Sequence, residues 1–116
     1  AKLDTQGNVE YVGQRHWLHA RNAANATLFL FNHGEAGEHY NVVGDVELYN
    51  DDMVQRLGHL MNKKPRLQYV DLEKSRPGHD RRYSLDGSKL KNMGWQQPIS
   101  FDDSLTKTID WMLSGE

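Results

Sequence analysis

The segments with strand patterning are short and scattered along this chain, and that feature most limits what it can fold into. Extended patterning is found at residues 9–18, 39–43 and 66–72, with polar or glycine-containing segments between them. Strands this few cannot build a complete doubly wound sheet. At 116 residues, the chain has the length of one domain. We therefore expect a small mixed α/β fold with about three short strands.

The periodicity of apolar residues predicts about four helices. They are expected at residues 22–32, 50–62, 87–93 and 101–113. Asn50 is expected to cap the second helix, and Ser100 with Asp103 resembles a capping box at the start of the fourth. Apolar residues surround most of the first helix, which predicts burial on most sides. Residues 1–8 are polar and expected to be loose, so the domain would span residues 9–116.

The composition excludes several classes of function. The chain has no cysteine, which removes disulfides, thiolate-bound metals and thiol catalysis. A net charge of −2 argues against a protein that coats nucleic acid. The longest nearly apolar run, residues 23–31, is too short to span a bilayer, and Lys2 is not followed by the apolar stretch of a signal peptide. We expect a soluble protein without nucleic-acid or membrane partners.

The sequence lacks recognisable catalytic and metal-binding motifs. None of the six histidines lies in a His-Glu-x-x-His motif. No serine lies in a Gly-x-Ser-x-Gly elbow, and no tyrosine is followed four residues later by a lysine. The glycines of residues 34–37 form neither a Walker motif nor a dinucleotide fingerprint. We therefore predict no catalytic, cofactor-binding or metal-binding residue in this chain.

The loop at residues 76–83, with the sequence RPGHDRRY, concentrates positive charge. Up to four positive groups lie within seven residues, namely Arg76, His79, Arg81 and Arg82. Guanidinium groups bind phosphate oxygens in pairs, and an imidazole adds a further donor, so the loop suits a phosphate or diphosphate ligand. The alternative is a solvated loop whose arginines pair with nearby acids: Asp71, Glu73, Asp80 and Asp86. Likewise, Arg15 could simply pack on the ring of Trp17, and Asn50 could be only a helix cap.

Three segments of the sequence resemble the extended short-chain dehydrogenase/reductase family, in particular its nucleotide-sugar epimerases and 4,6-dehydratases. They are RHWLHARNAANA at residues 15–26, GEHYNVVG at residues 37–44, and RPGHDRRY with the following LDGSKL at residues 76–90. The Arg-Pro-Gly-His-Asp core is quite specific, because few families place it before a Leu-Asp-x-Ser-Lys helix. The resemblance covers residues 7–114.

The resemblance is to the C-terminal, substrate-binding part of these enzymes only. It implies a subdomain without the Rossmann domain, which in the family carries the glycine-rich NAD site and the Tyr-x-x-x-Lys pair. The complete enzyme would be an NAD-dependent lyase of the cytoplasm. This chain alone would bind no NAD and would be inactive. The resemblance also implies a partner, either the missing Rossmann domain or a chain carrying it.

By the same resemblance, Arg15, Asn50, Arg76 and His79 would contact the diphosphate of a dTDP-hexose-like nucleotide sugar. The family often has glycine where Val43 stands, asparagine in place of Val46 and aspartate in place of Asn22, so the base and the sugar stay open.

Without its partner, the chain would expose an apolar face around Trp17 and residues 28–31, which would allow self-association. An alternative function is a stand-alone module that binds nucleotides or nucleotide sugars without catalysis.

Overall fold

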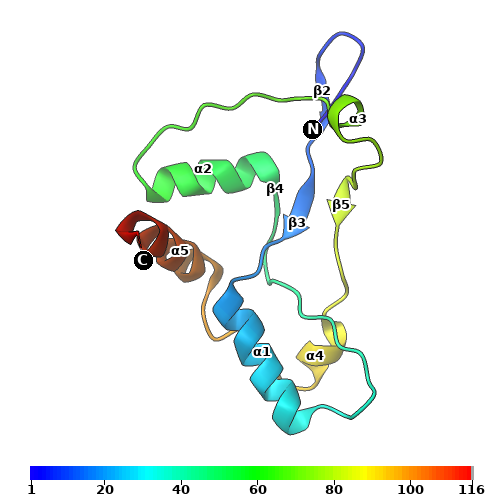
Figure 1. The fold of residues 1–116 in the computed structure, drawn as a ribbon, viewed down its shortest axis with the longest axis vertical. Coiled ribbons are helices and arrows are strands. Elements are labelled where there is room, and N and C mark those ends of the chain that lie inside the picture. Colours follow the sequence, from blue (N-terminus) through cyan, green and yellow to red (C-terminus); the bar gives the residue numbers. More distant parts are fainter. Residues whose placement is uncertain (116) are drawn as a thin grey trace. The chain divides into compact units, whose positions relative to one another are not determined.

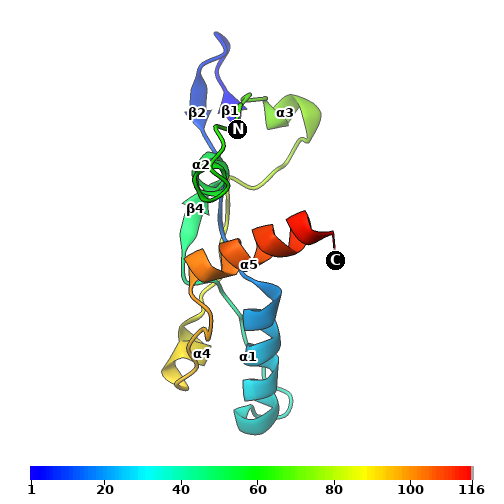
Figure 2. The same ribbon diagram turned by 90° about the vertical axis from the view of Figure 1, so that its left-hand side faces the viewer.

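The structure, a computed structural model, describes residues 1–115. These residues form five helices and five short strands, in the order β1 (Lys2–Leu3), β2 (Val9–Tyr11), β3 (Gln14–His16), α1 (Ala20–His33), β4 (Glu47–Tyr49), α2 (Asn50–Leu60), α3 (Leu72–Ser75), β5 (Arg82–Tyr83), α4 (Ser88–Asn92) and α5 (Phe101–Ser114). Figures 1 and 2 trace this path. The mixed α/β class predicted from the sequence is confirmed.

The contacts within the chain define two compact units. The sheet unit consists of Ala1–Arg15 and Glu47–Tyr83. The helix unit consists of His16–Val46 and the described residues from Ser84 onward. The assignment of residues 9–116 to one nucleotide-sugar-binding subdomain stays a prediction.

The sheet unit begins with a small antiparallel hairpin. Its strands β1 and β2 pair Lys2 with Tyr11 and Leu3 with Val9, and they lie side by side in Figure 2. The Asp4 carboxylate closes the turn by accepting the backbone N–H groups of Gln6 at 2.9 Å and Asn8 at 2.8 Å. Residues 1–8, expected to be loose, thus contain a strand and a turn stabilised by local hydrogen bonds.

The second sheet of this unit has the strand order β4-β3-β5, so β3 lies in the middle. Strands β3 and β5 are parallel, with Arg15 opposite Tyr83, and run side by side in Figure 1. Two backbone hydrogen bonds extend these pairings: Gln14 donates to Arg81 at 3.1 Å, and Asn50 donates to Gly13 at 2.8 Å. The residues around β3 are therefore bonded to chain segments on both sides.

Helix α2 follows β4 directly and differs from the expectation at its start. Tyr49 is the N-cap and makes no side-chain capping bond, while Asn50 is the first helical residue. The prediction that Asn50 caps the helix is therefore wrong by one position. Asp51 and Asp52 lie in the first turn, where carboxylates interact favourably with the helix dipole.

The core of the helix unit is small. It consists of the buried residues Ala26, Leu90 and Trp95, surrounded by partly buried apolar side chains: Phe29, Leu30, Val42 and Met93. The Trp95 indole N–H donates to Oδ1 of Asn25 at 2.9 Å, so this large ring has its polar atom satisfied.

Asn22 is the main polar residue buried in this unit, with 1% of its surface exposed. Its Nδ2 donates to Oε1 of Gln97 at 3.0 Å and to the Ile99 carbonyl at 2.9 Å. Its Oδ1 accepts the Ile99 backbone N–H at 3.1 Å. The side chain therefore fastens α1 to the segment that precedes α5.

The start predicted for α5 is confirmed by its capping bond, whereas the start predicted for α4 at residue 87 is wrong by one position, because Gly87 is the N-cap. Oδ1 of Asp86 accepts the Ser88 backbone N–H at 2.9 Å at the start of α4. Oγ of Ser100 accepts the Asp103 backbone N–H at 3.2 Å at the start of α5. The Ser100 bond joins residues close in sequence, which is why a local pattern predicted it.

The strands predicted at residues 39–43 and 66–72 are wrong, because neither segment pairs with a strand within the described chain. Side chains hold the first segment instead. Nε2 of Gln97 donates to the Val43 carbonyl at 3.0 Å, and Nζ of Lys89 donates to the His39 carbonyl at 2.8 Å. An alternating pattern forms a strand only where a neighbour supplies the ladder of hydrogen bonds.

The prediction that α1 is buried on most sides is wrong, whereas the prediction of exposed apolar side chains at residues 28–31 is confirmed for Leu28 and Phe31. The side chains of Leu28 and Phe31 are 64% and 88% exposed, and only Asn22 and Ala26 of this helix are buried. The apolar residues of α1 are thus spread around its circumference, whereas the contacts of the described chain cover only one side.

We predict that Asn22→Ala destabilises the chain by about 2 kcal/mol, because it leaves the polar groups of residues 97 and 99 without their buried partner. Urea unfolding followed by circular dichroism measures the change. Asn32→Ala, in the same helix but exposed, is the matched control and should change stability by less than about 0.5 kcal/mol. Equal effects of the two substitutions would contradict the anchoring role of Asn22.

Candidate functional site

The four residues expected to bind a diphosphate all belong to the sheet unit. Arg15 lies on β3 with its side chain exposed, and Asn50 begins α2 immediately after β4. Arg76 and His79 lie in the loop between α3 and β5. Because the sheet order is β4-β3-β5, the strands that carry or flank these residues are neighbours. Among residues 1–115, no hydrogen bond or ion pair joins the four side chains to one another, and their convergence on one ligand stays a prediction.

Asn50 has the most unusual environment of the four. Its Oδ1 is buried and accepts no hydrogen bond from the described residues. The side-chain amide lies against Gly13, where an added Cβ would come within 3.2 Å of Nδ2. Glycine at position 13 therefore leaves room for this amide. A buried amide oxygen without a partner is costly in a folded chain, so Oδ1 of Asn50 has unused capacity to accept a hydrogen bond from a donor. A diphosphate oxygen is itself an acceptor, so only Nδ2 of Asn50 can donate to it.

Arg76 and His79 differ in exposure. Arg76 is exposed and forms no ion pair within the described part of the chain. His79 is half-buried and borders a cavity of about 10 Å³ beside Tyr11 and Leu72. Between them, Gly78 has a φ of 77°, a left-handed conformation that glycine adopts at little cost. The loop predicted from Pro77 and Gly78 is therefore present.

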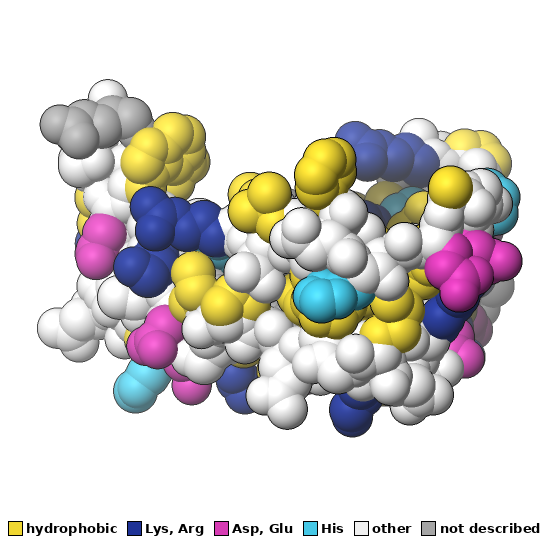
Figure 3. All heavy atoms as spheres, turned by 90° about the horizontal axis from the view of Figure 1, so that it is seen from below, with side chains coloured by type: hydrophobic (Ala, Val, Ile, Leu, Met, Phe, Trp, Pro, Cys, Tyr) yellow, Lys and Arg dark blue, Asp and Glu magenta, His cyan; other side chains and the backbone are white. Residues whose placement is uncertain are grey.

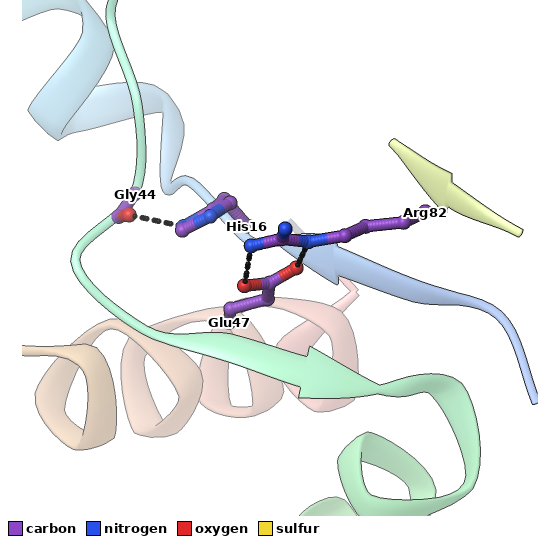
Figure 4. A network of polar contacts seen from close by, with 4 residues as sticks. All are labelled: His16, Gly44, Glu47 and Arg82. Carbon is purple, nitrogen blue, oxygen red and sulfur yellow. Dashed lines mark hydrogen bonds and ion pairs between the residues drawn. The ribbon is translucent and has the colours of Figure 1, made fainter. Parts of the chain in front are cut away.

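The other two cations of this loop are engaged elsewhere. Nε and Nη2 of Arg82 donate to the two carboxylate oxygens of Glu47, with Nη2 at 2.7 Å from Oε2 (Figure 4). This pairing raises the pKa of Arg82 above its usual value. The Arg81 guanidinium lies 4.8 Å from the ring centroid of Tyr11, a distance typical of a cation–π contact.

The ion pairs expected of a simple solvated loop are not the ones formed by the described residues. Asp71 and Asp86 accept backbone N–H groups at the starts of α3 and α4. Hydrogen bonds from Ser88 lower the pKa of Asp86, because they stabilise its ionised form. Glu47, which sequence reasoning did not single out as a partner, takes Arg82 instead. Its separation of 35 residues from Arg82 explains why no local pattern indicated the pair.

The helix unit contains a cavity of about 780 Å³ next to the segment at residues 41–45. Two of the polar side chains along it are paired within the unit. Nδ1 of His16 lies 2.9 Å from the Gly44 carbonyl oxygen (Figure 4), and Asn41 donates to the Asp86 carbonyl at 3.1 Å. A side chain at Gly44 would overlap the carbonyl oxygen of Trp17, which gives the glycine of the GEHYNVVG segment a packing reason.

The described residues meet the requirements of neither a metal site nor a membrane-spanning helix. No group of three or more His, Asp or Glu side chains is arranged to hold a metal ion within residues 1–115. None of the described helices has the length and apolar composition of a bilayer-spanning segment. Hydrophobic side chains reach the surface on the face drawn in Figure 3.

Comparisons with known proteins find the similarity that the sequence resemblance predicts. A family model described as GDP-mannose 4,6 dehydratase matches residues 2–108. The dTDP-glucose 4,6-dehydratase of Xanthomonas campestris is 36% identical over 110 residues, which cover 88% of this chain and 31% of the relative. The Haemophilus influenzae dTDP-glucose 4,6-dehydratase is 38% identical over 109 residues, covering 85% of this chain and 32% of the relative.

Solved structures show the same similarity. The dTDP-glucose 4,6-dehydratase of Bacillus anthracis in complex with NAD superposes with a TM-score of 0.78 and 30% identity, covering 93% of this chain and 34% of that one. The corresponding Streptomyces venezuelae enzyme with NAD bound gives a TM-score of 0.76 and 29% identity, covering 91% and 33%.

These matches define the class: the fold is that of part of an extended short-chain dehydrogenase/reductase, as the sequence resemblance indicated. The chain belongs to the GDP-mannose 4,6 dehydratase family. It spans 31% of the length of the Xanthomonas relative, so the activity of complete enzymes does not transfer to it directly.

We predict that Gly13→Ala displaces the Asn50 side chain, since the new Cβ would lie 3.2 Å from Nδ2. The side-chain amide resonances of Asn50 should shift in a nitrogen–proton correlation spectrum. Gly87→Ala is the matched control, because its Cβ would be equally close to a side chain, that of Val43 at 3.1 Å. Asn50 resonances that respond to neither substitution, or to both equally, would contradict the close packing of Asn50 on Gly13.

Proposed function

We propose that this chain is the nucleotide-sugar-binding part of an NAD-dependent 4,6-dehydratase and that it binds the diphosphate of a dTDP-hexose-like substrate. The observation that supports this most is the strand order β4-β3-β5, which makes neighbours of the strands that carry or flank Arg15, Asn50 and the Arg76–His79 loop. Membership of the family and the dehydratase names of the relatives favour dehydration, a lyase reaction, over epimerisation.

Each of the four residues would make a different contribution to diphosphate binding. The exposed guanidiniums of Arg15 and Arg76 would donate paired hydrogen bonds to phosphate oxygens. His79 would add a ring N–H, and the Asn50 amide would add a neutral hydrogen bond. Each charge-assisted bond is worth about 1.5–3 kcal/mol, and this binding energy would orient the distant sugar for reaction.

NAD binding is not part of the role that we propose for this chain. In the family, NAD exchanges a hydride with the substrate, and its pyrophosphate lies at a glycine-rich turn from strand to helix. Of the three strand-to-helix junctions among the described residues, those from β3 to α1 and from β4 to α2 contain no glycine, and the one from β5 to α4 contains a single glycine, Gly87. We therefore place the NAD site of the complete enzyme outside this chain.

We further propose that the exposed apolar surface of α1 contacts the part of the enzyme that carries the Rossmann domain. The exposed fractions of Leu28 and Phe31, 64% and 88%, support a covered position in the complete assembly. In the absence of that partner, the same surface would promote self-association. We also propose that the enzyme is located in the cytoplasm.

A second candidate function is a stand-alone module that binds nucleotides or nucleotide sugars without catalysis. It is favoured by one observation: all four proposed ligand-binding residues lie in the sheet unit. A neighbouring reading frame that encodes a glycine-rich dinucleotide-binding domain would support the enzyme, and its absence would favour the module.

We predict that dTDP binds the chain with a dissociation constant in the millimolar range, about 4 kcal/mol of standard free energy. Arg76→Ala should weaken binding about tenfold, because one charge-assisted contact is lost. Chemical-shift titration measures both affinities. Lys74→Ala removes an exposed positive charge only two residues away and should leave the affinity nearly unchanged. Shift changes that avoid all four residues, or that persist unaltered in Arg76→Ala, would overturn the proposed site.

We also predict that the purified chain does not convert dTDP-glucose in the presence of NAD, because hydride transfer requires a cofactor site. The assay follows the formation of the 4-keto product by its absorbance in alkali. Turnover by a sample whose mass matches the 116-residue chain would contradict this prediction.

A further inference from the structure

We propose that Arg82 is a positioning residue of the diphosphate site, which acts by holding Glu47 across the sheet rather than by touching the ligand. This inference rests on the proposed function. It concerns a residue that the sequence grouped with the phosphate-binding cations and that the structure separates from them.

The ion pair joins the two outer strands of the sheet. Glu47 is the first residue of β4, Arg82 is the first residue of β5, and β3 lies between these strands. Two contacts, from Nε and Nη2 of Arg82 to Oε1 and Oε2 of Glu47, fix the relative orientation of the two side chains (Figure 4). The pair therefore spans the central strand and links segments 35 residues apart.

Each of the joined strands leads directly to a proposed ligand-binding residue. Strand β4 ends at Tyr49, immediately before Asn50, and β5 begins three residues after His79. Arg15 lies on the central strand between them. A change in the separation of β4 and β5 would thus move Asn50 relative to the Arg76–His79 loop.

Strand pairing alone gives β5 little support. The strand has two residues, and its register with β3 consists of the pairs Gln14–Arg82 and Arg15–Tyr83. A ladder this short leaves the end of the loop dependent on side-chain contacts. The bidentate pair at Arg82 and the stacking of Arg81 on Tyr11 are two such contacts.

The same geometry argues against Arg82 as a phosphate ligand. Two of its N–H donors already bind a carboxylate, and the Glu47 side chain is only 21% exposed. A phosphate at Arg82 would have to displace this carboxylate or approach its negative charge, which is unfavourable. Arg15 and Arg76 form no ion pair among residues 1–115, so a phosphate would bind them without displacing a carboxylate.

The substitution Glu47→Gln separates the two roles of Arg82, because they predict opposite changes in the affinity for dTDP. If Arg82 binds phosphate directly, the change frees its guanidinium and removes a negative charge nearby, so dTDP should bind more tightly. If Arg82 is a positioning residue, the tie across β3 weakens and dTDP should bind roughly two- to fivefold more weakly. Chemical-shift titration with dTDP on the 116-residue chain measures the difference.

The matched control is Glu38→Gln, which makes the same charge change in another ion pair, with Lys89 at 2.7 Å in the helix unit. It should leave the affinity for dTDP unchanged. Arg82→Lys is the second variant: it keeps the charge but loses the paired geometry, and should also weaken binding. Circular dichroism confirms that each variant compared is folded. If Glu47→Gln is not folded, Glu47→Asp replaces it, because this change also loosens the pair while leaving the Arg82 guanidinium in place.

The outcomes distinguish this inference from the function on which it rests. Wild-type chain that gives no shifts with dTDP would overturn both. Binding in the wild type, with unchanged or tighter binding in folded Glu47→Gln, would overturn the positioning role alone. Weaker binding in both Glu47→Gln and Arg82→Lys, with the control unchanged, would establish it.

Discussion

The arrangement of the sheet unit depends on the backbone hydrogen bonds of Gly13 and Gln14. The Gly13 carbonyl accepts the Asn50 N–H at 2.8 Å, and the Gln14 N–H donates to the Arg81 carbonyl at 3.1 Å. These two bonds join three stretches of chain that are far apart in sequence. Because each strand is only two or three residues long, the sheet has few other backbone contacts, and side chains complete what the ladder leaves open.

In the helix unit, polar side chains also join segments that are far apart in sequence. Asn22 fastens α1 to the segment before α5, and Gln97 extends the connection to the Val43 carbonyl. The buried apolar cluster of Ala26, Leu90 and Trp95 is small, so satisfied amides carry an unusual share of the specificity of this unit. In both units, paired polar groups join segments that are far apart in sequence.

The sequence predictions were accurate where they depend on residues close in sequence, and less accurate where they depend on residues far apart. The cap at Ser100 joins residues three positions apart, and the sequence placed it correctly. The strand predicted at 39–43 failed because a strand needs a neighbour that no local pattern can reveal. For α1, apolar residues predicted burial, yet Phe31 is 88% exposed because burial depends on which surfaces other segments cover. The Glu47–Arg82 pair was missed for a similar reason: nothing in either local sequence marks its partner.

The stabilisation from the Asp4 turn depends on pH, whereas that from the hydrogen bonds of Asn22 does not. Hydrogen bonds from Asn8 lower the pKa of Asp4 below its unfolded value, so the stabilisation from this carboxylate is fully present above that value. It is lost as pH falls through the lowered pKa. The bonds of Asn22 involve amides and backbone groups, none of which titrates. Acid should therefore weaken the turn of the N-terminal hairpin and leave the hydrogen bonds of Asn22 unchanged.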